Sequence, residues 1–349
     1  MTVHPEFPLQ ADASVPGLSY NAIQTGLRHE AQTRGLNILS DTGAGITIQL
    51  VRGLMSFAPA EGGVTVTVQA TTPEWLQFLK ERLVDRLEQS APQVVQDVRW
   101  SGEDQAGQHP PNFRLARIVE ISAAGPAFLR VRAQAHDLSS FQDDAIHFRL
   151  LLPGNTAGPV VWPTLAANGA VRWPKGDKVL HRPIYTVRSV DRQHGIFDFD
   201  IFLHDGGRVT EWVRRAAPGE QFGLIGPSGG GIPETNRIFA FADETAFPAL
   251  ARILDTLPPE TTGQVALLAQ DGDRCGYPIQ APPGVSLIWH RRDYGVSLAD
   301  LALAADPVST GHFLWFACEK SDVLRIRAAY KARRGDASQS YIAAYWSQS

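Results

Sequence analysis

The stretch HRPIYTVRS, residues 181–189, has the length of a β-strand but an unusual set of side chains. Only two of its nine residues are aliphatic, and the others include two arginines, a tyrosine, a threonine and a proline. A strand that only fills a core has no use for Arg182 and Arg188. Pro183 cannot donate to a sheet, which favours an edge or the start of a strand. We therefore expect this strand to meet a ligand that carries negative charge and a flat ring.

The composition is that of an ordinary globular protein. The chain has 349 residues, which favours two or three domains, with 44% hydrophobic and 19% charged residues. The net charge of −4 provides no basic footprint for nucleic acid. Two cysteines are too few for a disulfide framework or a four-thiolate iron–sulfur cluster. No two histidines lie three or four residues apart, so no built-in metal site is predicted.

The beginning of the chain, MTVHPEFPLQADASVPG, lacks the basic and apolar segments of a signal peptide. No stretch approaches the ~18 apolar residues that a membrane-spanning helix needs. We therefore expect a cytoplasmic protein without a membrane partner.

The N-terminal third of the sequence predicts a small α+β domain over residues 21–100. Two alternating segments, GITIQLVRG and GVTVTVQA, are typical of strands, and TPEWLQFLKERLVDRLEQSA carries an apolar helical face. Thr72 is the expected N-cap of that helix. Residues 1–20 are rich in proline and aperiodic and are interpreted as a loose tail. Residues 101–112 are polar and are interpreted as a linker.

The rest of the chain divides at about residue 233. Residues 113–233 contain five or six alternating segments separated by turn signals, which predicts an antiparallel β-barrel. In residues 234–349 strands alternate with helices, which predicts a parallel sheet covered on both faces. The fold class is therefore multi-domain: an α+β domain, a barrel and an α/β domain.

The residues that follow the opening strand suggest what it binds. Gly206 and Gly207 form a turn before the short helix EWVRRAA, for which Thr210 is the expected N-cap. A helix N-terminus that follows glycines suits an anion, and the forked guanidinium of Arg182 suits phosphate. Tyr185 can stack on a flat heterocycle. A dinucleotide with a planar end, such as FAD, satisfies all of these features.

Each feature also has an ordinary structural explanation. A strand tyrosine often packs in a core, an arginine is often a solvated charge, and a Gly-Gly turn before a helix is common. Strict alternation also places Tyr185 on the opposite face from Arg182, Thr186 and Arg188. A ligand must then reach the strand at its end or edge.

Ordered motifs strengthen the flavin interpretation. From about residue 113 to the end, the sequence resembles the siderophore-interacting protein family, flavin-dependent ferric-siderophore reductases of the ferredoxin reductase-like superfamily. The motifs that carry this resemblance are RPIYTVR, DFDIFLHDGG, GPSGG and ADETAFPA. Residues 21–100 resemble more weakly a small domain of unknown function that occurs alone or fused to such reductases.

The resemblance implies FAD as cofactor and a ferric siderophore as substrate. The implied cofactor-binding residues are Arg182, Tyr185, Thr186, Arg188, Asp200, Phe202, His204, Gly207, Val209, Thr210, Gly226, Asp243 and Thr245. No catalytic side chain is predicted, because outer-sphere reduction of iron needs no general acid or base.

The electron donor and the substrate site are less specified. No G-x-G-x-x-G motif follows the strand RIFAFA, so use of NADH or NADPH is implied by the resemblance only. Reduced ferredoxin is an alternative donor. Asp243 and Glu244 begin a helix, where they either cap it or lie near the flavin and nicotinamide. Cationic candidates for the siderophore are Arg291, Arg292, Lys320 and Arg325.

The leading hypothesis is an FAD-dependent ferric-siderophore reductase. Two alternatives stay open: a flavin oxidoreductase with another electron acceptor, and a flavoprotein that binds a siderophore or a partner without turnover.

Overall fold

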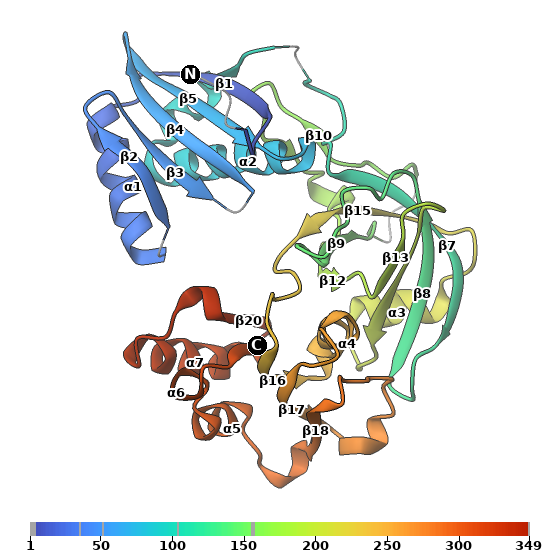
Figure 1. The fold of residues 1–349 in the computed structure, drawn as a ribbon. Helices are drawn as coiled ribbons and strands as arrows, with labels where there is room; N and C mark the ends of the chain where they lie inside the picture. The colour runs from blue at the N-terminus through green and yellow to red at the C-terminus, as the bar shows by residue number, and fades with distance from the viewer. Residues whose placement is uncertain (1–4, 35, 51, 103–104, 155–157, 348–349) are drawn as a thin grey trace. The chain divides into compact units, whose positions relative to one another are not determined.

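The computed structural model describes residues 5–34, 36–50, 52–102, 105–154 and 158–347 (Figure 1). The chain forms two compact units. The N-terminal unit comprises Met1–Phe113 together with Leu151–His181, and the C-terminal unit comprises Arg114–Leu150 together with Arg182–Ser349.

The N-terminal unit is built on an antiparallel sheet of six strands in the order β2-β3-β4-β5-β1-β6. Two helices accompany the sheet, and Thr72 caps the second one, since its hydroxyl accepts from the Trp75 amide at 3.4 Å. The predicted cap and the α+β class are confirmed. The elements are β1 Leu9–Pro16, α1 Tyr20–Arg34, β2 Asn37–Thr42, β3 Gly45–Leu50, β4 Gly53–Ala60, β5 Gly63–Ala70, α2 Pro73–Ser90 and β6 Arg99–Trp100.

The first residues are not the loose tail that the sequence suggested. Strand β1 pairs with β5 along its whole length, and β6 pairs with its other edge. Ala11, Ala13 and Val15 point into the core and are buried. The alternation is easy to miss because two of its three buried positions are alanine, which predicts a strand only weakly.

The proposed linker and part of the proposed barrel also belong to the N-terminal unit. The Gly107 amide donates to the Leu165 carbonyl, and the Leu165 amide donates to the Gln108 carbonyl, both at 2.8 Å. These bonds tie residues 101–112 to the segment 151–181, which also holds β10 Thr164–Leu165 and β11 Val171–Arg172.

Segment 151–181 packs on α2 and β6. Trp100 Nε1 donates to the Asn168 carbonyl at 2.8 Å, and Gln77 Nε2 donates to the Gly169 carbonyl at 2.9 Å. Gly169 has φ +79°, and a Cβ there would lie 2.5 Å from Trp100 Nε1. Only glycine therefore fits at this close approach. The sequence places this segment in the barrel because it precedes a barrel strand, whereas its contacts lie elsewhere.

The C-terminal unit begins with a seven-stranded sheet in the order β12-β9-β15-β7-β8-β14-β13. The expected strand 181–190 is split into β12 and β13, which lie at opposite ends of this order, so the short connection between them closes the sheet into a barrel. Its elements are β7 Phe113–Ala123, β8 Phe128–Ala135, β9 His147–Leu151, β12 Ile184–Thr186, β13 Ser189–Asp191, β14 Ile196–Phe202, α3 Arg208–Arg215 and β15 Gln221–Ser228.

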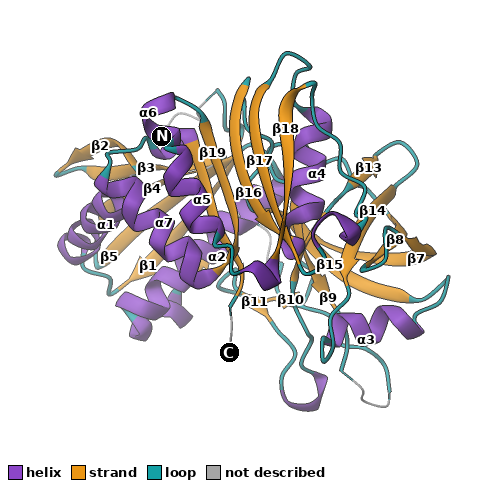
Figure 2. Ribbon diagram, turned by 90° about the horizontal axis from the view of Figure 1, so that it is seen from below, coloured by secondary structure: helices purple, strands orange, loops and turns teal. Residues whose placement is uncertain are grey.

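The second half of this unit is a sheet of five parallel strands, β18-β17-β16-β19-β20. Helix α4 covers one face, and α5 and α7 cover the other, as predicted (Figure 2). The elements are β16 Arg237–Asp243, α4 Phe247–Thr256, β17 Thr262–Ala269, β18 Gly284–Arg291, α5 Leu298–Ala305, α6 Pro307–Thr310, β19 Phe313–Glu319, α7 Lys320–Ala332 and β20 Ser340–Trp346.

Among the helices of the described ranges, we find none that combines the length and the apolar character needed to cross a membrane.

Candidate functional site

Strand β12 lies at one end of the strand order, as Pro183 indicated, and pairs antiparallel with β9. Its neighbouring side chains face opposite ways. The Tyr185 ring meets the fully buried Phe199 edge-on, with 5.8 Å between ring centroids, and burial raises the Tyr185 pKa. Thr186 is buried, and its Oγ1 lies 3.2 Å from His147 Nδ1. The strand thus offers a half-buried ring on one face and a hydroxyl on the other.

The two arginines of the motif differ in their surroundings. Arg182 is exposed, and its carbonyl accepts a hydrogen bond from Arg149 Nη1 at 3.0 Å. Arg188 is largely buried and pairs with Asp255 at 2.6 Å through Nη2. Its Nε is buried and has no hydrogen-bond partner among the described residues. A buried guanidinium N–H without an acceptor is costly unless a ligand or water supplies one.

The short helix α3 begins earlier than predicted. Gly206 has φ +72°, Gly207 is the N-cap residue, and no side chain caps the helix. Thr210 is therefore not the cap. It is buried in the first turn, and its hydroxyl accepts from the His204 amide at 3.3 Å. The glycine turn takes the cap position because it starts the helix at Gly207, three residues before Thr210.

This start also changes which amides are available. The Glu211 amide donates to the Gly207 carbonyl at 2.9 Å, which is the first bond within the helix. The amides of Arg208, Val209 and Thr210 precede it and have no intrahelical acceptor. The positive end of α3 is therefore uncapped at residues 208–210.

Several glycines occupy places that a side chain cannot enter. A Cβ on Gly207 would lie 2.6 Å from the His204 ring. A Cβ on Gly226 would lie 3.0 Å from Phe148, which places Gly226 against the barrel core. Cβ atoms on Gly229 and Gly230 would lie 2.5 Å from the His147 ring and 2.4 Å from the Tyr341 ring. The GPSGGG segment is thus a tight packing surface.

Asp200 lies in a network that joins the two halves of the C-terminal unit. Its carboxylate accepts from Arg130 Nε and Nη2 at 2.7 and 2.8 Å and from the Tyr277 hydroxyl at 2.6 Å. Phe202, two residues on, packs against Phe128 at 5.3 Å. Both Asp200 oxygens are occupied, so this carboxylate orients its neighbours.

Asp243 ends β16 and is almost fully buried. One oxygen accepts from the Thr245 amide and hydroxyl at 3.1 and 2.5 Å, and the other accepts from Trp346 Nε1 at 2.6 Å. Burial raises the pKa of this carboxyl. The capping interpretation of Asp243 is confirmed, and the cap also binds the C-terminal strand.

The cationic candidates are only partly brought together. Arg292 pairs with the buried Glu244 at the carboxyl end of the parallel sheet. Arg291 is paired with Asp293 at 2.8 Å, and Lys320 is exposed at the start of α7. Arg325 is held by Asp300 of α5, at 2.5 Å. Arg291 and Arg292 thus lie at the carboxyl edge of the parallel sheet, whereas Arg325 lies in the helical layer.

The sequence interpretation missed His147 and Tyr345. His147 on β9 contacts Thr186, and its Nε2 lies 3.2 Å from the hydroxyl of Tyr345 on β20. The available signal was a histidine in the mostly apolar stretch AIHFRLLLP, but its partner Tyr345 lies 198 residues away.

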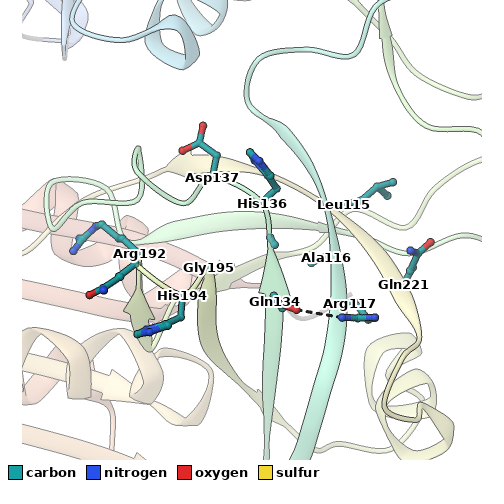
Figure 3. Close-up of a pocket in the computed structure, with 12 residues that line it drawn as sticks. Leu115, Ala116, Arg117, Gln134, His136, Asp137, Arg192, His194, Gly195 and Gln221 are labelled. Carbon is teal, nitrogen blue, oxygen red and sulfur yellow. Dashed lines mark hydrogen bonds between the residues drawn. The ribbon is translucent and has the colours of Figure 1, made fainter.

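A separate pocket of about 500 Å³ lies at the end of the barrel where β8 finishes and β14 begins (Figure 3). Its lining includes Ala135, the last residue of β8, and Gly195, which precedes β14. The predicted cofactor residues Phe202 and His204 lie at or beyond the opposite end of β14. None of the predicted cofactor residues lines this pocket.

Comparison with known proteins agrees with the geometry. Residues 117–231 match the siderophore-interacting FAD-binding domain, and residues 235–349 match the siderophore-interacting protein domain. The NADPH-dependent ferric-chelate reductase of Escherichia coli is 28% identical over 240 residues, which cover 67% of this chain and 92% of that protein. The ferric vibriobactin reductase ViuB of Vibrio cholerae is 29% identical over 208 residues, which cover 57% and 74%.

Solved structures show the same fold. A siderophore utilization protein from T. fusca aligns with a TM-score of 0.56 and 26% identity, over 68% of this chain and 93% of that one. The siderophore-interacting protein SipS from Aeromonas hydrophila aligns with a TM-score of 0.58 and 21% identity, over 68% and 92%. With two family domains matched in order over residues 117–349, the chain belongs to the siderophore-interacting protein family, and the C-terminal unit is called the reductase unit below.

Proposed function

We propose that this protein uses FAD to pass electrons from NADPH to ferric siderophores, so that iron leaves as iron(II). The observation that carries the proposal is the pair of adjacent family domains, which the chain shares with a relative named as an NADPH-dependent ferric-chelate reductase over 92% of that relative's length. Reduction weakens binding of iron by hard oxygen ligands, and the freed metal then enters the cytoplasm, where we place the reaction.

The residues present fit FAD. The uncapped amides of α3 and the exposed guanidinium of Arg182 suit its pyrophosphate. The half-buried ring of Tyr185 suits the flat isoalloxazine, and Thr186 supplies a hydroxyl for its redox edge. The unpartnered Nε of Arg188 is a donor that a bound anion or carbonyl satisfies. Bound FAD would supply hydride acceptance and delivery of single electrons.

The remaining residues of the proposed site have supporting roles. Gly207 allows the His204 ring to lie against the turn before α3, and Gly226 keeps β15 close to the barrel core. Asp200 and Asp243 hold their neighbours through occupied carboxylates. The members that complete this part of the proposed site are Phe202, Val209, Thr210 and Thr245.

Ferric siderophores are often anionic, and we assign their binding to the cations at the carboxyl edge of the parallel sheet. Arg292 is held in place by Glu244, and Arg291 by Asp293. Lys320 begins α7 at the end of β19, whereas Arg325 lies farther along this helix, beside Asp300. The charges of Arg291, Arg292 and Lys320 would attract an anionic chelate along this edge, and Arg325 would add a cation in the adjacent helical layer.

The experiment measures electron transfer from the donor to the flavin and from the flavin to iron. The purified protein should be yellow and should release FAD on denaturation. Under anaerobic conditions NADPH should bleach the flavin, and a ferric siderophore should restore its colour while an iron(II) chelator reports the metal. NADH and reduced ferredoxin, offered in parallel, identify the donor.

Two outcomes decide against the proposal. A colourless protein that cannot be reconstituted with FAD removes every flavin role. A flavin that NADPH reduces but that a quinone, and no ferric siderophore, reoxidises would assign the protein another acceptor.

A further inference from the structure

His147 is a buried polar residue at the meeting point of three strands. It lies on β9 and is 4% exposed, and its two ring nitrogens each have one side-chain partner at 3.2 Å. Nδ1 faces the hydroxyl of Thr186 on β12, and Nε2 faces the hydroxyl of Tyr345 on β20. Gly229, whose Cβ would collide with the ring, leaves the space that the imidazole occupies.

The imidazole is neutral at physiological pH. Burial, with a smaller effect of the Arg252 charge, lowers the pKa of His147 to about 4, against the opposing effect of a hydrogen bond to the Tyr185 backbone. A neutral imidazole has one N–H and one lone pair, so between the two hydroxyls it donates to one and accepts from the other. The Thr186–His147–Tyr345 chain then has two complementary arrangements.

The two arrangements give the Thr186 hydroxyl opposite hydrogen-bonding roles towards any other partner. When Tyr345 donates to Nε2, Nδ1–H donates to Thr186, and the Thr186 hydrogen is free to donate elsewhere. When Thr186 donates to Nδ1, Nε2–H donates to Tyr345, and Thr186 offers only lone pairs elsewhere. Exchange between them moves the ring proton from one nitrogen to the other, and His147 stays neutral in both.

We propose that His147 is a positioning residue that lets Thr186 donate a hydrogen bond to the oxidised flavin and accept one from the reduced flavin. The inference rests on the proposed function, in which Thr186 faces the redox edge of the isoalloxazine. That edge carries a nitrogen that accepts a hydrogen bond when oxidised and bears a hydrogen when reduced. A partner with fixed polarity would serve one state and oppose the other, whereas the Thr186–His147–Tyr345 chain serves both.

The sign of the change in flavin affinity depends on which hydrogen-bonding groups each substitution leaves unpaired. In His147→Phe the ring volume is retained, but the Thr186 hydroxyl loses its inner partner. When Thr186 must accept from the reduced flavin, its own O–H is then buried without an acceptor, which costs more than an unused lone pair. The substitution therefore weakens binding of reduced FAD more than of oxidised FAD.

The test is the midpoint potential of FAD in the full-length protein, measured anaerobically against a reference dye. We expect His147→Phe to change the ratio of reduced to oxidised affinity about tenfold, which for a two-electron couple lowers the potential by about 30 mV. Thr186→Val should lower it also, and His147→Phe should add nothing in a Thr186→Val background. Tyr345→Phe should lower the potential by a smaller amount, because Tyr345 is the less buried end of the Thr186–His147–Tyr345 hydrogen-bonded chain.

Thr261→Val is the matched control, since this threonine is also fully buried and its hydroxyl has no partner among the described residues. It should leave the potential unchanged. Equal potentials in wild type, His147→Phe and Tyr345→Phe would overturn the inference, as would additive shifts in the double variant. If His147→Phe does not fold, the Tyr345→Phe and Thr186→Val pair decides by the same criterion. A wild type that binds FAD and reduces ferric siderophores keeps the proposed function intact in either case.

Discussion

The same bidentate arginine–aspartate pair occurs in both units, with different surroundings. In the N-terminal unit, Arg28 Nε and Nη2 donate to Asp41 at 2.6 and 2.9 Å, and the side chains are 50% and 25% exposed. In the reductase unit, Arg130 donates to Asp200 at 2.7 and 2.8 Å, but Asp200 is fully buried and also accepts from Tyr277. The first pair lies at a surface, whereas the second links the barrel to the α/β domain.

The two units also differ in which charged side chains they bury. Among the described residues, the N-terminal unit buries the carboxylate Glu74, whereas the reductase unit buries Arg114, Asp198, Asp200, Asp243, Glu244 and Arg252. Burial of charge is unfavourable unless hydrogen bonds compensate it. Hydrogen bonds compensate the buried charge of Arg252, which donates to the Val187 carbonyl at 2.6 Å and pairs with Asp143 at 2.8 Å. Arg252 therefore holds the connection between β12 and β13 against α4.

Removal of the buried carboxylate should have the largest effect. We expect Asp200→Ala to destabilise the reductase unit by about 3–5 kcal/mol, because Arg130 and Tyr277 lose their acceptor. Asp41→Ala, which breaks the more exposed Arg28–Asp41 pair, should change the stability of the N-terminal unit little. Hydrogen exchange of β14 against β4 measures each unit separately. Equal effects of the two substitutions would show that burial does not distinguish the pairs.

Acid should act on the reductase unit through His147. The folded pKa of about 4 lies below the ordinary value of 6.5, so the neutral ring contributes stability above pH 6.5 that is lost as the pH falls to 4. The gap corresponds to about 3 kcal/mol. Denaturant unfolding between pH 7 and pH 4 should show this decline in wild type and a smaller one in His147→Phe. Parallel pH profiles would mean that the ring is protonated or exposed in the native state.

Flavin affinity should depend on Arg182 and not on Arg28. A charge-assisted phosphate contact contributes about 1.5–3 kcal/mol, so Arg182→Ala should raise the FAD dissociation constant roughly 10- to 100-fold. Arg182→Lys should restore part of it, because the charge remains and the fork is lost. Arg28→Ala, in the N-terminal unit, serves as control. Unchanged FAD affinity in Arg182→Ala would remove this residue from the site.

The smallest expected effect concerns the packing of segment 151–181 on the N-terminal sheet. Gly169 and Gly176 both have positive φ, but a Cβ meets Trp100 only at Gly169 and nothing within 4 Å at Gly176. Both alanine variants pay for backbone strain, and Gly169→Ala should lose about 1–3 kcal/mol more from the clash. Thermal unfolding and exchange of the segment's amides measure the difference. Variants of equal stability would place the segment away from Trp100.

Local patterns in the sequence were sufficient for much of the fold. Helical periodicity and the Thr72 cap predicted α2, and the strand–helix alternation after residue 233 predicted the parallel sheet covered on both faces. Pro183 correctly placed β12 at an end of its sheet. These features depend on neighbouring residues, so a single sequence carries them.

Only the tertiary structure decided where β1 and segment 151–181 pack, because their contacts are with residues distant in sequence. It also assigned the α3 cap to Gly207, since the φ of Gly206 sets where the helix starts. The chain from Thr186 through His147 to Tyr345 spans three strands and 198 residues between its last two members. Sequence determined which side chains are polar, and the fold determined which of them are buried together, because pairing of buried polar groups depends on distance in space.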